Sequence, residues 1–152
     1  MIDPEKIFKG KVVILCVGNV DKGDDGAGPY LASEIHGKCP YEVINGGIAP
    51  ENYTGVLKKM DPDTVIIADA VDFGGKTGEI RIFSGGDLRS GSVSTHDVSL
   101  KLLIEYLKAS MDADIYVLGI MPGANRSGKN LSDEVKNAVK TLIPVFCVDK
   151  NT

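Results

Sequence analysis

The sequence lacks the features of membrane and secreted proteins. Its longest uninterrupted apolar run, Val12 to Val17, is far shorter than the ~18 residues that a membrane-spanning helix requires. The N-terminal segment MIDPEKIFKGK does not have the layout of a secretory signal peptide. We therefore expect a cytoplasmic protein without membrane insertion.

Cysteine is also scarce. Cys16, Cys39 and Cys147 are far apart in the chain, odd in number and never in a C-x-x-C pair. This pattern indicates neither a disulfide framework nor a thiolate zinc site. We expect free thiols in a reducing compartment, with Cys16 buried and unreactive inside a strand.

The sequence has no stripe of basic residues. It contains 17 Lys and Arg residues and 21 Asp and Glu residues, which gives a net charge of −4. This argues against nucleic-acid binding through phosphates.

The 152 residues suit a single domain over 1–152, and 43% hydrophobic residues are enough for a core. Glycine is abundant, with 18 residues that cluster where apolar runs end, so the loops there need unusual backbone angles.

Apolar runs alternate with segments of helical spacing. Strands are expected at 12–17, 42–45, 64–70, 78–83 and 115–121, and helices at 29–36, near 53–60, at 98–107 and at 133–142 after an N-cap at Ser132. The order predicts a parallel sheet with right-handed crossovers. The segment VDFGGKT alone connects the predicted strand 64–70 to the strand 78–83. This connection is too short for a parallel crossover, so the strand 78–83 should run antiparallel at an edge of the sheet. The predicted fold is a three-layer α/β/α sandwich with a five-stranded, mostly parallel sheet.

Acidic residues follow two of the predicted strands. Asp24 and Asp25 come after 12–17, while Asp69 ends 64–70 and Asp72 follows it. Functional groups in such sheets gather beyond the carboxyl ends of the strands, where the strand order reverses. We therefore expect these acids to face one another across a crevice.

The helix after Asp97 should begin at the same edge of the sheet, which would bring His96 over the aspartates. Two carboxylates and an imidazole suit a divalent transition metal such as nickel, zinc or cobalt, and they also suit carboxylate activation of water. The spacing does not separate these two uses.

Each of these residues also has a structural interpretation. Asp24 or Asp25 can cap the helix at 29–36. A carboxylate at Asp69 is costly to bury unpaired, so a structural hydrogen-bond network can explain it as well as a functional site. His96 can cap its helix or pack on the surface.

Two glycine-rich segments are similar to nucleotide-binding loops. GNVDKGDDGAG lacks the G-x-G-x-x-G spacing, and its adjacent aspartates would repel a pyrophosphate. GANRSGKN, from Gly123 to Asn130, nearly matches a phosphate loop, but Asn130 replaces the hydroxyl residue that holds magnesium. An exposed loop is expected there, with a nucleotide-binding regulator as the alternative.

Six motifs occur in order along the chain: CVGN, GDDGAGP, GGIAPEN, VIIADAVDFGGKTGEIRIF, STHDVSL and LGIMPG. Together they resemble the maturation endopeptidases of [NiFe] hydrogenases, most closely the group serving formate-hydrogenlyase-type hydrogenases (hydrogenase 3). The resemblance extends from Val12 to Pro122. The segment GANRSGKNLSDEV departs from it.

The resemblance implies an α/β/α fold and an aspartic endopeptidase that removes the C-terminal extension of a hydrogenase large-subunit precursor after nickel insertion. The family's metal-contacting positions fall on Asp25, Asp69 and His96, and we expect Asp25 and Asp69 to be catalytic. Nickel is expected to arrive with the substrate rather than to be held permanently. The alternative is a non-catalytic nickel-binding or chaperone-like module that uses the same ligands.

Overall fold

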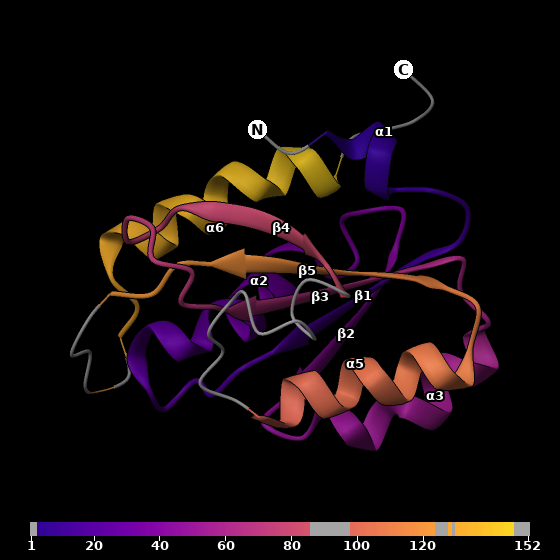
Figure 1. Cartoon of the computed structure of the whole chain (residues 1–152). Coiled ribbons are helices and arrows are strands. Elements are labelled where there is room, and N and C mark those ends of the chain that lie inside the picture. Colours follow the sequence, from indigo (N-terminus) through magenta and orange to yellow (C-terminus); the bar gives the residue numbers. More distant parts are fainter. Residues whose placement is uncertain (1–2, 86–97, 124–127, 129, 148–152) are drawn as a thin grey trace.

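The computed structural model describes residues 3–85, 98–123, 128 and 130–147. Helices cover both faces of a central sheet (Figure 1). The strands are β1 (Val12–Val17), β2 (Glu42–Gly47), β3 (Thr64–Ala70), β4 (Ile80–Ser84) and β5 (Asp114–Ile120). The helices are α1 (Pro4–Ile7), α2 (Ala27–Ile35), α3 (Thr54–Met60), α5 (Val98–Ser110) and α6 (Asp133–Phe146), with 3₁₀ turns η1 (Gly23–Gly26) and η2 (Pro50–Tyr53).

The sheet has the strand order β2-β1-β3-β5-β4. The pairs among β2, β1, β3 and β5 are parallel, whereas β4 pairs antiparallel with β5 at the edge. Arg81 of β4 is exposed and Ile80 and Ile82 are half-buried, whereas Phe83, on the same face as Arg81, is buried in the layer with α5. The predicted fold class and the antiparallel edge strand are confirmed. The order reverses between β1 and β3, because β2 lies on one side of β1 and β3 on the other.

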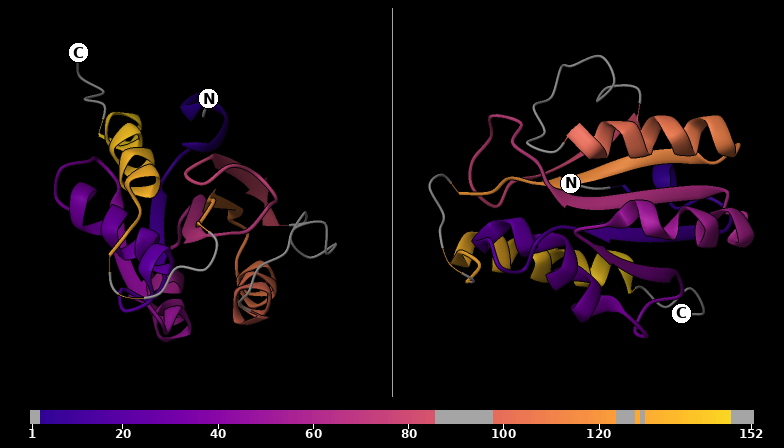
Figure 2. Two further views of the ribbon diagram at one scale, coloured as in Figure 1. Left: turned by 90° about the vertical axis from the view of Figure 1, so that its left-hand side faces the viewer. Right: turned by 90° about the horizontal axis from the view of Figure 1, so that it is seen from below.

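Side chains of each strand alternate between two hydrophobic layers. Ile14 and Cys16 of β1 pack in the layer under α2 and α6, whereas Val13 and Leu15 pack in the layer with α3 and α5. The end-on view in Figure 2 shows α6 and α5 on opposite sides of the sheet. β1 and β3 are buried on both faces, so their sequences are continuous apolar runs.

The positions of β1 and β3 match the predicted ranges, and the other elements differ mainly at their ends. α2 begins at Ala27, two residues before the predicted start. α6 continues past the predicted end at 142 to Phe146, although Pro144 lies inside it. Leu142 and Phe146 are almost fully buried, and their packing offsets the hydrogen bond that Pro144 cannot donate. No helix in the described ranges is long and apolar enough to cross a membrane.

Cys16 is fully buried in β1, as predicted. Burial, together with the nearby Cys39 thiol, raises the pKa of Cys16 to about 12. The protonated thiol is a poor nucleophile, so the prediction of an unreactive side chain is consistent with its environment.

Candidate functional site at the strand-order reversal

The ends of β1 and β3 lie side by side at the reversal of strand order. Cys16 pairs with Ala68, so the next residue of β3, Asp69, lies level with the end of β1. On its other side, Asp69 is in register with Gly119 of β5. Asp69 therefore occupies the centre of the sheet's carboxyl edge, where the topology predicted it.

The first turn of α2 sits directly on these strand ends. A Cβ atom on Gly28 would collide with the carbonyl oxygen of Val17 and would lie 2.7 Å from that of Ala68. Only a residue without a side chain permits this approach. Gly28 thus sets how closely the segment that carries Asp25 meets the end of β3, and η1 itself contacts β3.

Asp25 is held by its backbone and presents its side chain to solvent. The Asn19 amide donates to the Asp25 carbonyl at 2.9 Å, and the Asp25 amide donates to the Lys22 carbonyl at 3.1 Å. Gly18, with φ of +150°, leaves no room for a Cβ atom beside the same Asp25 carbonyl. The loop therefore fixes Asp25 at the sheet edge while its side chain stays exposed.

Asp69 has a contrasting environment. It is only 5% exposed, and its Oδ1 atom accepts a hydrogen bond of 2.8 Å from the Ala70 amide. A nearly buried carboxylate in weakly screened surroundings interacts strongly with any proton or cation that reaches it. Asp25 and Asp69 thus form an accessible and a shielded carboxylate on two adjoining elements.

Asp24 does not join this pair, contrary to the prediction that it would face Asp69. It is 1% exposed, and its carboxylate accepts hydrogen bonds from the Gly123 amide at 2.9 Å, the Ser132 amide at 2.6 Å and the Ser132 hydroxyl at 2.9 Å. Ser132 is the predicted N-cap of α6, and its Oγ atom accepts from the Val135 amide at 3.3 Å. Asp24 therefore anchors the 3₁₀ turn η1, which also carries Asp25, to the start of α6.

The N-cap residue of α2 is Gly26, which has no side chain, so neither aspartate occupies the N-cap position at which a capping side chain was expected. Asp72, the fourth acid expected at the crevice, accepts a hydrogen bond of 3.0 Å from the Gly74 amide in the connection to β4. This contact is typical of a turn residue.

His96 lies outside the described residues, and so does most of the phosphate-loop match, 124–127 and 129. Among the residues that the structure describes, no group of three His, Cys, Asp or Glu side chains could hold a metal ion. The ligand role of His96 therefore stays a prediction. The first amide of the phosphate-loop match, that of Gly123, is already bonded to the Asp24 carboxylate.

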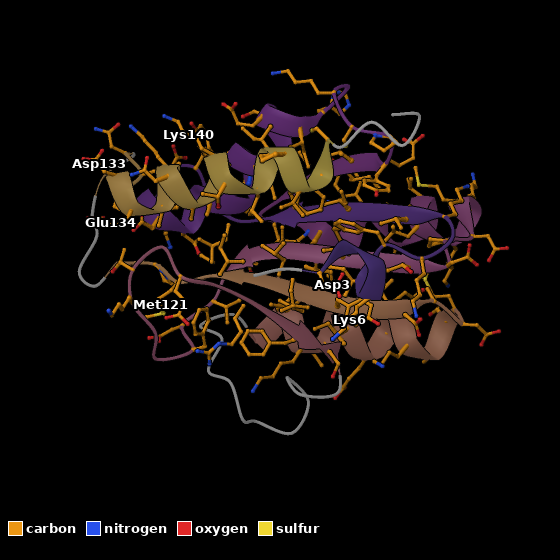
Figure 3. All side chains as sticks on the ribbon, turned by 90° about the horizontal axis from the view of Figure 1, so that it is seen from above. Asp3, Lys6, Met121, Asp133, Glu134 and Lys140 are labelled. Atoms are coloured by element: carbon orange, nitrogen blue, oxygen red, sulfur yellow. The ribbon has the colours of Figure 1, made fainter. Side chains whose placement is uncertain are left out.

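The start of α6 belongs to the same end of the molecule as the strand ends. Figure 3 shows Asp133 and Glu134, in the first turn of α6, on the same side as Met121, which follows β5. Sequence reasoning missed the bond between Asp24 and Ser132. The two residues are 108 positions apart, and no local pattern connects them.

The family model of hydrogenase maturation proteases (HycI) matches residues 27–147. Hydrogenase 3 maturation protease of Escherichia coli K12 is 38% identical over 133 residues, which cover 86% of this chain and 85% of that protein. The crystal structure of a [NiFe] hydrogenase maturation protease HycI from Thermococcus kodakarensis KOD1 has a TM-score of 0.82 at 30% identity, covering 94% of this chain and 95% of that one. The solution structure of the E. coli endopeptidase HycI has a TM-score of 0.76 at 35% identity, covering 90% and 89%.

Proposed function

Because this chain belongs to the HycI family of hydrogenase maturation proteases, we propose that it cleaves the C-terminal extension from a [NiFe] hydrogenase large-subunit precursor after nickel has been inserted. The observation that carries the proposal is the pair Asp25 and Asp69 at the strand-order reversal. One carboxylate is exposed and the other is shielded. An extended polypeptide can reach the exposed one, and the fold holds the other in place.

We assign Asp25 and Asp69 to catalysis in an aspartic endopeptidase. One of the two carboxylates accepts a proton from a water molecule as its oxygen adds to the scissile carbonyl. The same proton then passes to the departing amine, so that the peptide bond breaks and the carboxylate is regenerated. The hydrogen bond from the Ala70 amide fixes the Asp69 carboxylate at 2.8 Å, which orients it for this task.

Nickel enters this scheme as cargo of the substrate. Carboxylate oxygens and an imidazole nitrogen suit a divalent transition metal, and we propose that Asp25, Asp69 and His96 complete the coordination of nickel already held by the precursor. Such an ion would polarise the scissile carbonyl as a Lewis acid. Three ligands from three separate segments, with no thiolate among them, should bind a free ion only weakly. Zinc metalloproteases, by contrast, hold their ion with two histidines of an H-E-x-x-H motif on one helix.

The decisive test is incubation of the purified protein with a purified, nickel-loaded large-subunit precursor. Intact-mass measurement should show the precursor shortened at its C-terminus by the wild type and unchanged by Asp25→Asn, Asp69→Asn or His96→Ala. Asp21→Asn is a matched control, because Asp21 is an exposed aspartate of the same loop. A precursor that binds the protein and keeps its full mass would establish the chaperone-like module instead. Wild-type cleavage by any two of the three variants would refute the site.

A further inference from the structure

The outer edge of β4 carries backbone groups that point away from the sheet. β4 is at one end of the strand order, and among the described strands it pairs with β5 alone. The Met121 amide donates to the Glu79 carbonyl at 2.9 Å, and hydrogen-bonded pairs recur at every second residue of an antiparallel ladder. The amide and carbonyl groups of Ile80 and Ile82 therefore face outward.

A β-bulge fixes this alternation at the start of the strand. Gly78, with φ of +87°, donates its amide to the Met121 carbonyl at 2.8 Å, while the carbonyl of Glu79 accepts from the Met121 amide. Two residues thus lie opposite one, as in a bulge that begins with glycine. A Cβ atom on Gly78 would lie 2.6 Å from the Glu134 carbonyl oxygen, so the bulge also seats the start of β4 against α6.

A groove with a volume of about 690 Å³ lies beside this edge. Ile80 and Ile82 form one wall, and Leu142 and Val145 of α6 form another. Both isoleucines are half-buried against the hydrophobic layer under α2 and α6, so the groove lies on that face of the sheet. Side chains of a polypeptide that paired with β4 would enter the groove at every second position.

The charges at the groove favour an acidic partner. Lys6, Arg81 and Asp3 are its charged residues, and Figure 3 shows Lys6 and Asp3 on the α6 side of the sheet. The Arg81 guanidinium lies on the α5 side of the strand, 4.5 Å from the centre of the Phe73 ring and 2.8 Å from the Glu79 carboxylate. An acidic side chain beside Arg81 and a terminal carboxylate near Lys6 would both be attracted.

The edge of β4 begins close to the candidate catalytic carboxylate. Asp69 is in register with Gly119, and Gly119 is in register with Arg81. Neighbouring strands are about 4.8 Å apart, so the backbone of β4 passes about 10 Å from that of Asp69. A polypeptide that is cleaved at Asp69 can therefore reach the edge of β4 about three residues after the scissile bond.

We propose that the C-terminal extension of the precursor pairs with β4 and adds a sixth strand to the sheet. This inference rests on the proposed protease function, which brings an extended polypeptide with a terminal carboxylate to this edge. Hydrogen bonds to the backbone of Ile80 and Ile82 would supply affinity, and the groove would select apolar side chains at alternate positions. The extension would run parallel to β4, from Ile80 toward Ser84. About eight extended residues span the distance from Asp69 to the end of β4.

Amide hydrogen exchange, followed by NMR on the full-length protein, tests the pairing. The probe is a synthetic peptide with the sequence of the precursor's C-terminal extension. We expect the amides of Ile80 and Ile82 to exchange about tenfold more slowly at saturating peptide. The amides of Arg81 and Phe83 face β5 and should change little. Absence of peptide binding, or binding with unchanged exchange at Ile80 and Ile82, would overturn the proposal.

Proline substitution separates backbone pairing from side-chain contact. Ile82→Pro removes an outward-facing amide and leaves the ladder with β5 intact, whereas Ile82→Ala shortens the side chain and keeps the amide. We expect the peptide to bind Ile82→Pro about tenfold more weakly than Ile82→Ala, with urea midpoints that show both variants to be folded. Ile80→Pro and Ile80→Ala repeat the comparison if Ile82→Pro does not fold. Equal affinity within the pair would overturn the proposal.

The same measurements distinguish the other outcomes. Slow exchange at Ile80 and Ile82 without peptide, together with a dimer in size-exclusion chromatography, would assign the edge to a second copy of the chain and overturn the proposal. Precursor cleavage by the wild type without protection of β4 would overturn this inference alone. Peptide-dependent protection of β4 without precursor cleavage would support the pairing and refute the protease function.

Discussion

The adjacent residues Asp24 and Asp25 offer a sharp test, because the structure gives them opposite roles. Asp24 is buried and accepts three hydrogen bonds from Gly123 and Ser132, whereas Asp25 is exposed. Replacing either one by asparagine removes one charge and changes the shape of the side chain very little. We expect Asp24→Asn to lower the free energy of unfolding and Asp25→Asn to abolish cleavage without lowering it.

The magnitude for Asp24→Asn follows from its acceptors. Oδ1 accepts from the Ser132 amide, and Oδ2 accepts from the Gly123 amide and the Ser132 hydroxyl. Asparagine has one acceptor oxygen, so its NH₂ group must face at least one of these donors. A lost hydrogen bond to a charged group costs about 1.5–3 kcal/mol, and the buried amide left without a partner adds to this. We expect a loss of about 3 kcal/mol after partial relaxation.

Urea unfolding followed by circular dichroism measures this loss, and an unchanged m-value would show that both variants unfold as the wild type does. For Asp25→Asn we expect a change within about 0.5 kcal/mol, as at an ordinary surface position. Ser132→Ala completes a double-mutant cycle with Asp24→Asn. Because the two side chains share the hydrogen bond from the Ser132 hydroxyl to the Asp24 carboxylate, their effects should be non-additive by about 1 kcal/mol.

Two outcomes would refute this reasoning. If the urea midpoint of Asp24→Asn equals that of the wild type, the three hydrogen bonds do not stabilise the fold. If Asp24→Asn has full stability and no cleavage activity while Asp25→Asn remains active, Asp24 is the functional carboxylate. The first result would remove the structural role of Asp24, and the second would reverse the assignment within the GDDG motif.

Three further predictions concern the strand ends, the metal and the core thiol. Gly28→Ala should reduce both the urea midpoint and precursor cleavage, because its Cβ atom would meet the backbone of Val17 and Ala68, whereas Gly55→Ala, with open space around it, should do neither. Chelator-stripped enzyme should cleave a nickel-loaded precursor, and metal-charged enzyme should leave a nickel-free one intact; equal cleavage of the nickel-free precursor would contradict delivery by the substrate. Because the pKa of Cys16 rises from 9.0 to about 12 on folding, the unfolded state loses this proton first. In urea titrations, the free energy of unfolding of the wild type, compared with that of Cys16→Ala, should therefore fall by about 1.4 kcal/mol per pH unit between about pH 9 and 12. If the difference between the two free energies does not change with pH, folding does not raise the pKa of the thiol.

The sequence alone determined the architecture, because its signals are local. The apolar runs at Val12–Val17 and Thr64–Ala70 specify strands buried on both faces, and the short connection before β4 forbids a parallel crossover. The positions of Asp25 in the loop after β1 and of Asp69 near the end of β3 follow from the same patterns. Their places at the sheet edge were therefore predictable before any contact was known.

Tertiary structure decided what each side chain at that edge contacts. Asp24 and Asp25 are adjacent acids of one motif, and the hydrogen bonds that Asp24 accepts from the distant residues Gly123 and Ser132 make it an internal anchor. Packing also extended α6 through Pro144, against its helix propensity. α6 also packs against α2 although the two helices are far apart in the sequence, and no periodicity records that contact. Local patterns fix the elements, whereas hydrogen bonds and close approaches between distant segments depend on how those elements pack.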